Sequence, residues 1–209
     1  LSNPSIDRLR TLFDPRVAIT STGFANFFRD TPEYGARFER ALRAALFSSE
    51  QLLPGLTDIV VRGEGGGDAV GGPTERNRFT QGPASAPVDL PLNSLSHGYQ
   101  STIAWIADLI GHYTLEAEGD FTPETMRGLV LIDELDLYLH PTWQVVLVRA
   151  LKRAFPKMQF IFTTHSPLVL AALDPTEDQV VLLTRNEKTG SVERVIRPED
   201  PRLLTASEL

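Results

Sequence analysis

The chain contains no cysteine among its 209 residues. This absence excludes disulfides, thiolate metal ligands and cysteine nucleophiles. No apolar run is long enough to span a bilayer, and the N-terminus lacks the basic-then-apolar pattern of a signal peptide. We therefore expect a cytoplasmic protein that makes no contact with a membrane.

Lysine is also scarce, and the chain carries a net negative charge. Only three of the twenty basic residues are lysines, and the net charge is −7. This charge argues against a generally basic, DNA-coating protein, although a local basic patch stays open. No glycine is followed by lysine, so the phosphate-cradling pattern Gly-x-x-x-x-Gly-Lys-Ser/Thr is missing.

The composition is that of a globular protein, with 42% hydrophobic and 22% charged residues. We expect two parts, residues 1–94 and residues 95–209. The first part is predicted to hold a helix from Thr31 to about Gln51 with a buried face, and a small β-layer. The predicted strands of this layer are Leu56–Arg62, Arg76–Thr80 and Val88–Leu92. Residues 63–72 hold six glycines and are predicted to be a flexible hairpin tip.

The second part alternates between helical and strand patterns. The predicted helices are His97–Glu116 with Ser96 as its N-cap, a helix from Pro141 to about Phe155, and Pro167–Leu173. The predicted strands are Gly128–Ile132, Met158–Thr164, Gln179–Thr184 and Ser191–Ile196. The two apolar strands joined by a helix predict parallel pairing, and their unbroken apolar runs predict burial on both faces. The chain is therefore predicted to be an α/β protein with a parallel sheet.

Polar residues follow both apolar strands. Asp133 and Glu134 come directly after the first strand, and His165 follows the second. Open parallel sheets hold their ligands at this carboxyl edge, and adjacent carboxylates need a cation such as Mg²⁺ or a water network. Taken alone, the acids also fit a cap of the next turn, and His165 also fits a hydrogen-bonded turn residue. Two such strand ends together favour a functional site.

The segment Leu95-Ser96-His97-Gly98-Tyr99-Gln100 precedes the long helix. A serine and a glycine at a helix start leave free N–H groups at the positive end of the helix dipole, which suits phosphate. An ordinary helix cap would have the same residues.

Together these segments resemble the ABC-type ATPases. Residues 95–100 resemble the signature motif, Leu129–Glu134 the Walker B strand, Leu135-Asp136 the D-loop, and His165 the switch histidine. The amino-acid sequence of residues 132–141 and 164–167 is similar to that of the soluble, non-transporter branch of the family. This branch is related to RecF, chromosome-maintenance and overcoming-lysogenisation-defect ATPases and includes many phage-defence ATPases. The resemblance covers about residues 95–183.

The resemblance implies that the chain supplies part of an ATP site between two subunits. Asp133 would hold Mg²⁺, Glu134 would act as general base, and His165 would contact the γ-phosphate. Ser96 and Gly98 would bind the nucleotide held by the other subunit. Gln100 and Asp136 complete the residues expected to face the nucleotide or the partner. ATP and Mg²⁺ are thus the expected cofactors, and a homodimer formed around ATP the expected assembly.

The missing phosphate loop is the main departure from this family. In the family the loop precedes the signature motif, so we expect this chain, which begins at Leu1, to be the signature-to-C-terminus half of an ATPase domain. Such a domain would serve a prokaryotic DNA-maintenance or phage-defence protein, with DNA or a nuclease as a further partner.

Two rival hypotheses stay open at the level of sequence. A Mg²⁺-dependent nuclease could use Asp133, Glu134 and Asp136 to hold two metals. A degenerate ATPase fold could instead serve as a dimerising scaffold that lacks the loop altogether.

Overall fold

The computed structural model describes residues 32–47, 52–60 and 78–195. The helices are α3 (Pro32–Leu46), α5 (His97–Glu116), α6 (Pro141–Ala154) and α7 (Pro167–Ala171), with 3₁₀ turns η1 (Leu92–Ser94) and η2 (Pro123–Thr125). The strands are β1 (Leu56–Val60), β2 (Arg78–Gln81), β3 (Val88–Pro91), β4 (Gly128–Ile132), β5 (Met158–Phe162), β6 (Leu182–Arg185) and β7 (Val192–Val195). Every predicted helix and strand that falls on the described residues is present. The predicted cap at Thr31 and the glycine-rich loop at 63–72 lie outside the described residues.

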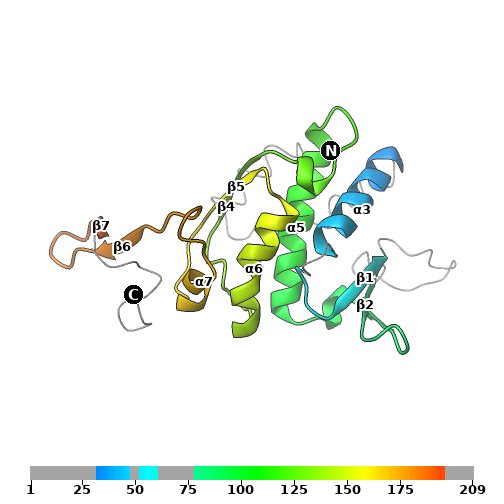
Figure 1. The fold of residues 1–209 in the computed structure, drawn as a ribbon, viewed down its shortest axis with the longest axis horizontal. Helices are drawn as coiled ribbons and strands as arrows, with labels where there is room; N and C mark the ends of the chain where they lie inside the picture. The colour runs from blue at the N-terminus through cyan, green and yellow to red at the C-terminus, as the bar shows by residue number, and fades with distance from the viewer. Residues whose placement is uncertain (1–31, 48–51, 61–77, 196–209) are drawn as a thin grey trace.

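β4 and β5 form a parallel pair, joined through α6 (Figure 1). Their register is continuous, from Gly128 opposite Met158 to Ile132 opposite Phe162. The predicted α/β fold with parallel strands is therefore confirmed. Because the two strands run in the same direction, the residues that follow them lie at one edge of the sheet.

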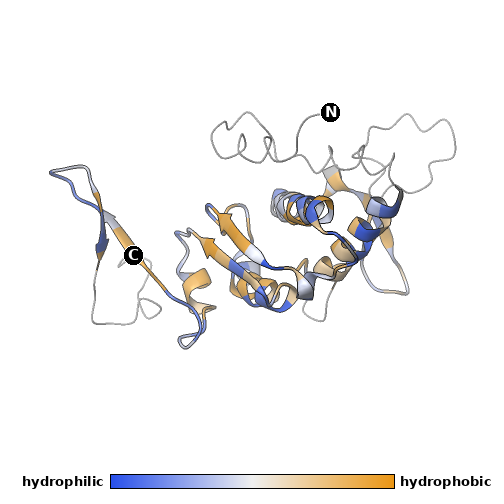
Figure 2. Ribbon diagram, turned by 90° about the horizontal axis from the view of Figure 1, so that it is seen from above, coloured by the Kyte–Doolittle hydropathy of each residue, from blue (hydrophilic) through white to orange (hydrophobic). Residues whose placement is uncertain are grey.

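The prediction that β4 and β5 are buried on both faces is wrong. One face is covered, because Ile132, Phe160 and Phe162 pack against the hydrophobic core. On the other face Leu129, Leu131 and Ile161 are 55%, 62% and 52% exposed. Figure 2 shows the two strands as largely hydrophobic ribbons, so the apolar run continues across both faces. Apolar sequence permits burial, but burial requires a second layer, and among the described residues helices pack on one face of the two strands alone.

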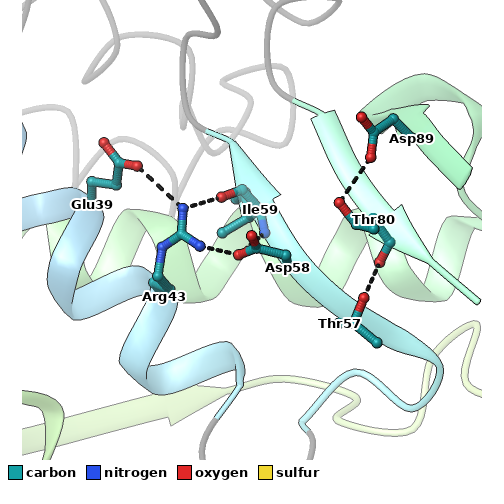
Figure 3. Close-up of polar contacts among 7 residues, drawn as sticks. All are labelled: Glu39, Arg43, Thr57, Asp58, Ile59, Thr80 and Asp89. Carbon is teal, nitrogen blue, oxygen red and sulfur yellow. Dashed lines mark hydrogen bonds and ion pairs between the residues drawn. The ribbon is translucent and has the colours of Figure 1, made fainter. Parts of the chain in front are cut away.

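The antiparallel sheet β1-β2-β3 adjoins α3. Arg43 of α3 links the two, because its guanidinium forms an ion pair with Asp58 and donates to the Ile59 carbonyl at 2.5 Å (Figure 3). Its other contact is with Glu39, at 3.5 Å on the same helix. A hydrogen bond of 2.8 Å between Thr80 and Asp89 joins β2 to β3. The helix and the small β-layer are thus held by side-chain bonds as well as by packing.

One hydrophobic core runs through the described chain. The predicted inner face of α3 is buried, and it packs beside the buried isoleucines of α5 and the buried leucines of α6. These residues are Phe38, Leu42, Ala45 and Leu46 of α3, Ile103, Ile106 and Ile110 of α5, and Leu147 and Leu151 of α6. The core crosses the expected boundary between residues 94 and 95, and the division into two parts at that point stays a prediction.

Candidate functional site

The two strand ends that carry the predicted chemistry lie side by side. Asp133 and Glu134 follow β4, and Thr163 to His165 follow β5, its parallel neighbour. Backbone bonds continue the pairing past the strands, from Thr163 N–H to the Ile132 carbonyl and from Leu135 N–H to the Thr163 carbonyl, both at 3.0 Å. The polar residues are thus fixed by sheet geometry.

Thr163 connects the two acids to the neighbouring strand. Its hydroxyl accepts a hydrogen bond from the Glu134 backbone N–H at 2.8 Å and donates one to Asp133 Oδ1 at 2.5 Å. A hydroxyl donated to a carboxylate is a strong, charge-assisted bond. Reasoning from the sequence missed this threonine. Its position next to Thr164-His165 was the available signal, but the bond itself spans thirty residues.

Glu134 has a left-handed backbone, with φ at 51°. A residue with a Cβ pays about 1–2 kcal/mol in this conformation, and such strain gathers at functional sites. The Glu134 side chain is exposed, and no described residue donates a hydrogen bond to its carboxylate. The fold thus holds an unengaged carboxylate in a strained turn at the edge of the sheet.

His165 lies at the same edge, three residues after the end of β5. Its side chain is exposed, and within the described ranges no side chain or backbone group bonds its ring. That Glu134 and His165 open on one shared cleft stays a prediction.

Asp136 makes a side-chain contact within its own chain. Its half-buried carboxylate accepts a hydrogen bond from the Thr164 hydroxyl of the same chain. This bond joins the Asp136 carboxylate to the loop that carries His165. A contact of Asp136 with a partner stays a prediction.

The signature-like segment lies against the loop that follows β4. Ser96 occupies the N-cap position of α5 as predicted, but its side chain makes no capping bond and is exposed. Gln100 points back to its own loop, because its Nε2 donates to the Leu95 carbonyl at 2.6 Å. The rings of His97 and Tyr138 are 6.0 Å apart. The structure therefore brings this segment beside the predicted D-loop.

Two residues of the segment are held by packing. Gly98 is buried, and a Cβ added to it would lie 2.5 Å from the Tyr138 carbonyl oxygen, so glycine is needed there for close approach. The Tyr99 hydroxyl donates to the Pro54 carbonyl, and burial raises the pKa of Tyr99 above its ordinary value. Both observations give the motif a packing role beside any contact with phosphate.

The described acids do not form a cluster that could hold two metal ions. Among the described residues, no group of three or more His, Asp or Glu side chains is placed to hold a metal. This finding counts against the nuclease hypothesis, which needs Asp133, Glu134 and Asp136 to converge. One carboxylate with a neighbouring hydroxyl does fit Mg²⁺, which usually keeps several waters and binds substrate phosphates as well. Asp133 and Thr163 therefore fit a position beside the Mg²⁺ ion and the waters that accompany the phosphates of a nucleotide.

A comparison with protein families identifies the domain. Residues 25–171 match the family described as "AAA domain, putative AbiEii toxin, Type IV TA system". The chain belongs to this family. The match includes all of the candidate site residues from Ser96 to His165. It confirms the ATPase-domain part of the resemblance, and the RecF-related branch stays a prediction.

Three curated relatives each match slightly less than half of this chain. The Septu protein PtuA of Bacillus mycoides (strain KBAB4) is 42% identical over 97 residues, which make up 46% of this chain and 13% of that protein. The "Retron Ec83 probable ATPase" of Escherichia coli is 40% identical over 101 residues, 48% of this chain and 18% of that protein. The "Retron Vc95 probable ATPase" of Vibrio cholerae serotype O1 biovar El Tor is 38% identical over 95 residues, 46% of this chain and 18% of that protein. The aligned residues span less than a fifth of each relative.

A solved SMC ATPase structure aligns with 83% of this chain and 89% of its own, at 16% identity and a TM-score of 0.49. This score is below the value at which we would infer a shared fold. None of the helices in the described ranges of the AAA domain is long and apolar enough to cross a membrane.

Proposed function

We propose that this AAA domain binds and hydrolyses ATP with Mg²⁺, and that two copies dimerise around the nucleotide. We further propose that it works in the cytoplasm, in a phage-defence or DNA-maintenance protein with DNA or a nuclease as partner. The family match and the two relatives named as probable ATPases support the ATPase part. The Septu and retron relatives favour defence over DNA maintenance.

One observation carries the proposal. The Glu134 carboxylate stands unengaged at the edge of the sheet, while Thr163 fixes the backbone of Glu134 and the carboxylate of Asp133. A carboxylate that stabilises the fold would have donors around it, because an unpaired charge gains nothing from folding. A left-handed backbone at the same residue adds a cost that stability alone does not explain. Both features suit a catalytic base.

The residues divide the chemistry between them. Asp133 would hold Mg²⁺ mostly through water, and the metal supplies charge neutralisation at the phosphates. Glu134 would orient a water and accept its proton at the carboxylate. His165, on the neighbouring strand end, would donate a hydrogen bond to the terminal phosphate and so register its presence.

Binding of the nucleotide needs more than these residues. Ser96 is exposed and makes no capping bond, so its hydroxyl and the start of α5 can bind a phosphate carried by a second subunit. The sequence has no glycine followed by lysine, and we propose that residues outside this chain bind the phosphates in each subunit. Hydrolysis would therefore depend on dimerisation.

The test is Glu134→Gln in the full-length protein that contains this chain. We expect ATP to bind normally, turnover to fall by at least about a hundredfold, and the dimer to persist, because only the proton acceptor is lost. Turnover, nucleotide binding by calorimetry and mass by light scattering check these three results. Glu187→Gln, at an exposed turn residue, is the matched control.

Near-normal turnover in Glu134→Gln would show that another residue is the base. A wild-type protein that binds ATP but never hydrolyses it would favour the scaffold hypothesis. Cleavage of supercoiled DNA with Mg²⁺ and without ATP would instead favour the nuclease.

A further inference from the structure

Gln144 bridges the loops that follow β4 and β5. It lies in the first turn of α6, and its Nε2 donates to the Leu139 carbonyl at 3.0 Å and lies 3.5 Å from the Asp136 carbonyl. On its other side, Oε1 accepts a hydrogen bond of 2.6 Å from the Ser166 hydroxyl. The amide nitrogen of Gln144 thus donates to the loop after β4, and its amide oxygen accepts from the loop after β5.

Thr164 closes this bridge into a ring. Its hydroxyl donates to the Asp136 carboxylate and accepts from the Ser166 backbone N–H at 3.0 Å. Asp136, Gln144, Ser166 and Thr164 are therefore joined in a closed circuit of four hydrogen-bonded residues. Ser166 is buried and the other three are half-buried, so water competes little for these bonds.

The ring adjoins the two residues proposed to do the chemistry. Glu134 is two positions before Asp136, and the Leu137 N–H bonds back to the Glu134 carbonyl at 2.9 Å. His165 stands between Thr164 and Ser166, both of which are ring members. Each loop is therefore fixed at points within two residues of its functional side chain.

We propose that Gln144 is a positioning residue for ATP hydrolysis, which holds the loop of Glu134 and the loop of His165 in one fixed arrangement. The inference rests on the proposed function. It also assigns the Asp136 carboxylate a role within its own subunit, as the ring member that faces Thr164. Because water activation and phosphate contact need matched positions, a small displacement of either loop lowers the rate without weakening nucleotide binding.

The chemistry of the side chain explains why glutamine serves here. The ring needs a donor toward two backbone carbonyls and an acceptor toward a hydroxyl, and a side-chain amide has both. A glutamate would present its carboxylate to the carbonyl oxygens of Asp136 and Leu139. A methionine of similar length would leave those carbonyls and the Ser166 hydroxyl without this partner.

The experiment measures ATP turnover in the full-length protein that contains this chain, with the variant Gln144→Met. We expect kcat to fall by about ten- to a hundredfold while the KM for ATP stays unchanged. Thr164→Val, which removes the opposite side of the ring, should lower kcat in the same way. The double variant should be little worse than either single variant, because both break one network. Gln179→Met, at an exposed position, is the matched control for the substitution.

The proposed function and this inference can fail separately. Wild-type protein without turnover, or normal turnover in Glu134→Gln, would overturn both. If those two behave as expected, a kcat of Gln144→Met within about twofold of the wild type would overturn the inference alone. The inference would also be overturned if the losses of kcat in Gln144→Met and Thr164→Val multiplied in the double variant. Should Gln144→Met fail to fold, Ser166→Ala removes the same 2.6 Å bond with a smaller change and is judged by the same criteria.

Discussion

Gly98 packs directly against the carbonyl group of Tyr138, and a Cβ added to the glycine would lie 2.5 Å from that oxygen. The contact joins the start of α5 to the loop that follows β4. Tyr138 itself has a left-handed backbone, with φ at 64°. The two segments therefore pack backbone against backbone, with no room for a side chain at position 98.

Gly98→Ala should destabilise the protein by about 1–3 kcal/mol, as expected for overpacking. The better helix propensity of alanine opposes this loss by about 1 kcal/mol, which the clash with a backbone oxygen outweighs. Urea unfolding of the full-length protein measures the change. Gly119→Ala is the control, because nothing lies within 4 Å of its added Cβ, and its effect should stay within about 0.5 kcal/mol. Equal stability of the two variants would contradict the close contact.

Ser96→Arg should abolish turnover in the full-length protein but leave nucleotide affinity of the monomer nearly unchanged. The hydroxyl is proposed to touch only the phosphate held by the other subunit, and a bulky cation there blocks closure. Mixed dimers provide the measurement, because one altered signature segment should spare one of the two sites. Loss of nucleotide binding by the monomeric variant would exclude a role across the interface.

Glu134→Gly should be more stable than Glu134→Ala by about 1 kcal/mol, although both lose the carboxylate. The reason is the left-handed backbone, which glycine adopts without strain. Thermal or urea unfolding compares the two variants. At Asp133, which has no positive φ, the order should reverse, with alanine the more stable residue. An alanine variant at Glu134 as stable as the glycine variant would argue against strain at this position.

The 209-residue chain alone should bind Mg-ATP weakly and should not hydrolyse it. Its candidate residues act on the metal, the water and the terminal phosphate, and no lysine-bearing glycine loop cradles the phosphates. Calorimetry with a non-hydrolysable ATP analogue and Mg²⁺ tests the chain first, and then a longer polypeptide that carries a phosphate loop. Micromolar binding by the chain alone would show that it holds the nucleotide without such a loop.

Lys152 should contribute pH-dependent stability. Hydrogen bonds with Glu177 at 2.8 Å and then with Asp178 at 3.1 Å raise the pKa of Lys152 above its ordinary value. A raised pKa in the folded state stabilises below the ordinary lysine pKa, and this stability is lost as pH rises through the raised value. Lys152→Met should therefore cost up to about 1 kcal/mol at neutral pH and nothing at strongly alkaline pH. Lys157→Met, at an exposed residue, should show no such pH dependence.

Much of the fold was predictable because its signals are local. Ser96 and the apolar periodicity after it predict α5 with the bounds that the structure has, and the apolar run at Gly128–Ile132 does the same for β4. Pro141 marks the start of α6 in the same way. These patterns depend on neighbours within a few positions, which the sequence displays directly.

The arrangement around the site was less predictable. The residues of the strand ends could be named from sheet geometry, but the bonds of Thr163, Thr164 and Gln144 join positions 22 to 30 residues apart or turn back from a helix. No local pattern reports which hydroxyl meets which carboxylate. Likewise the burial of Leu129 and Leu131 depends on what packs over them, so an apolar sequence alone overestimates it.

The exposed face of β4 and β5 has a practical consequence for solubility. Leu129, Leu131 and Ile161 form an apolar strip on a two-stranded sheet, and within the described residues neither outer edge of that sheet is paired. Open edges beside apolar strips template aggregation. The expressed chain should therefore aggregate as its concentration rises, which lowers the yield and broadens the size distribution in solution. Leu131→Lys would relieve this by placing a charge at the centre of the strip, at a position that makes no contribution to the packed core.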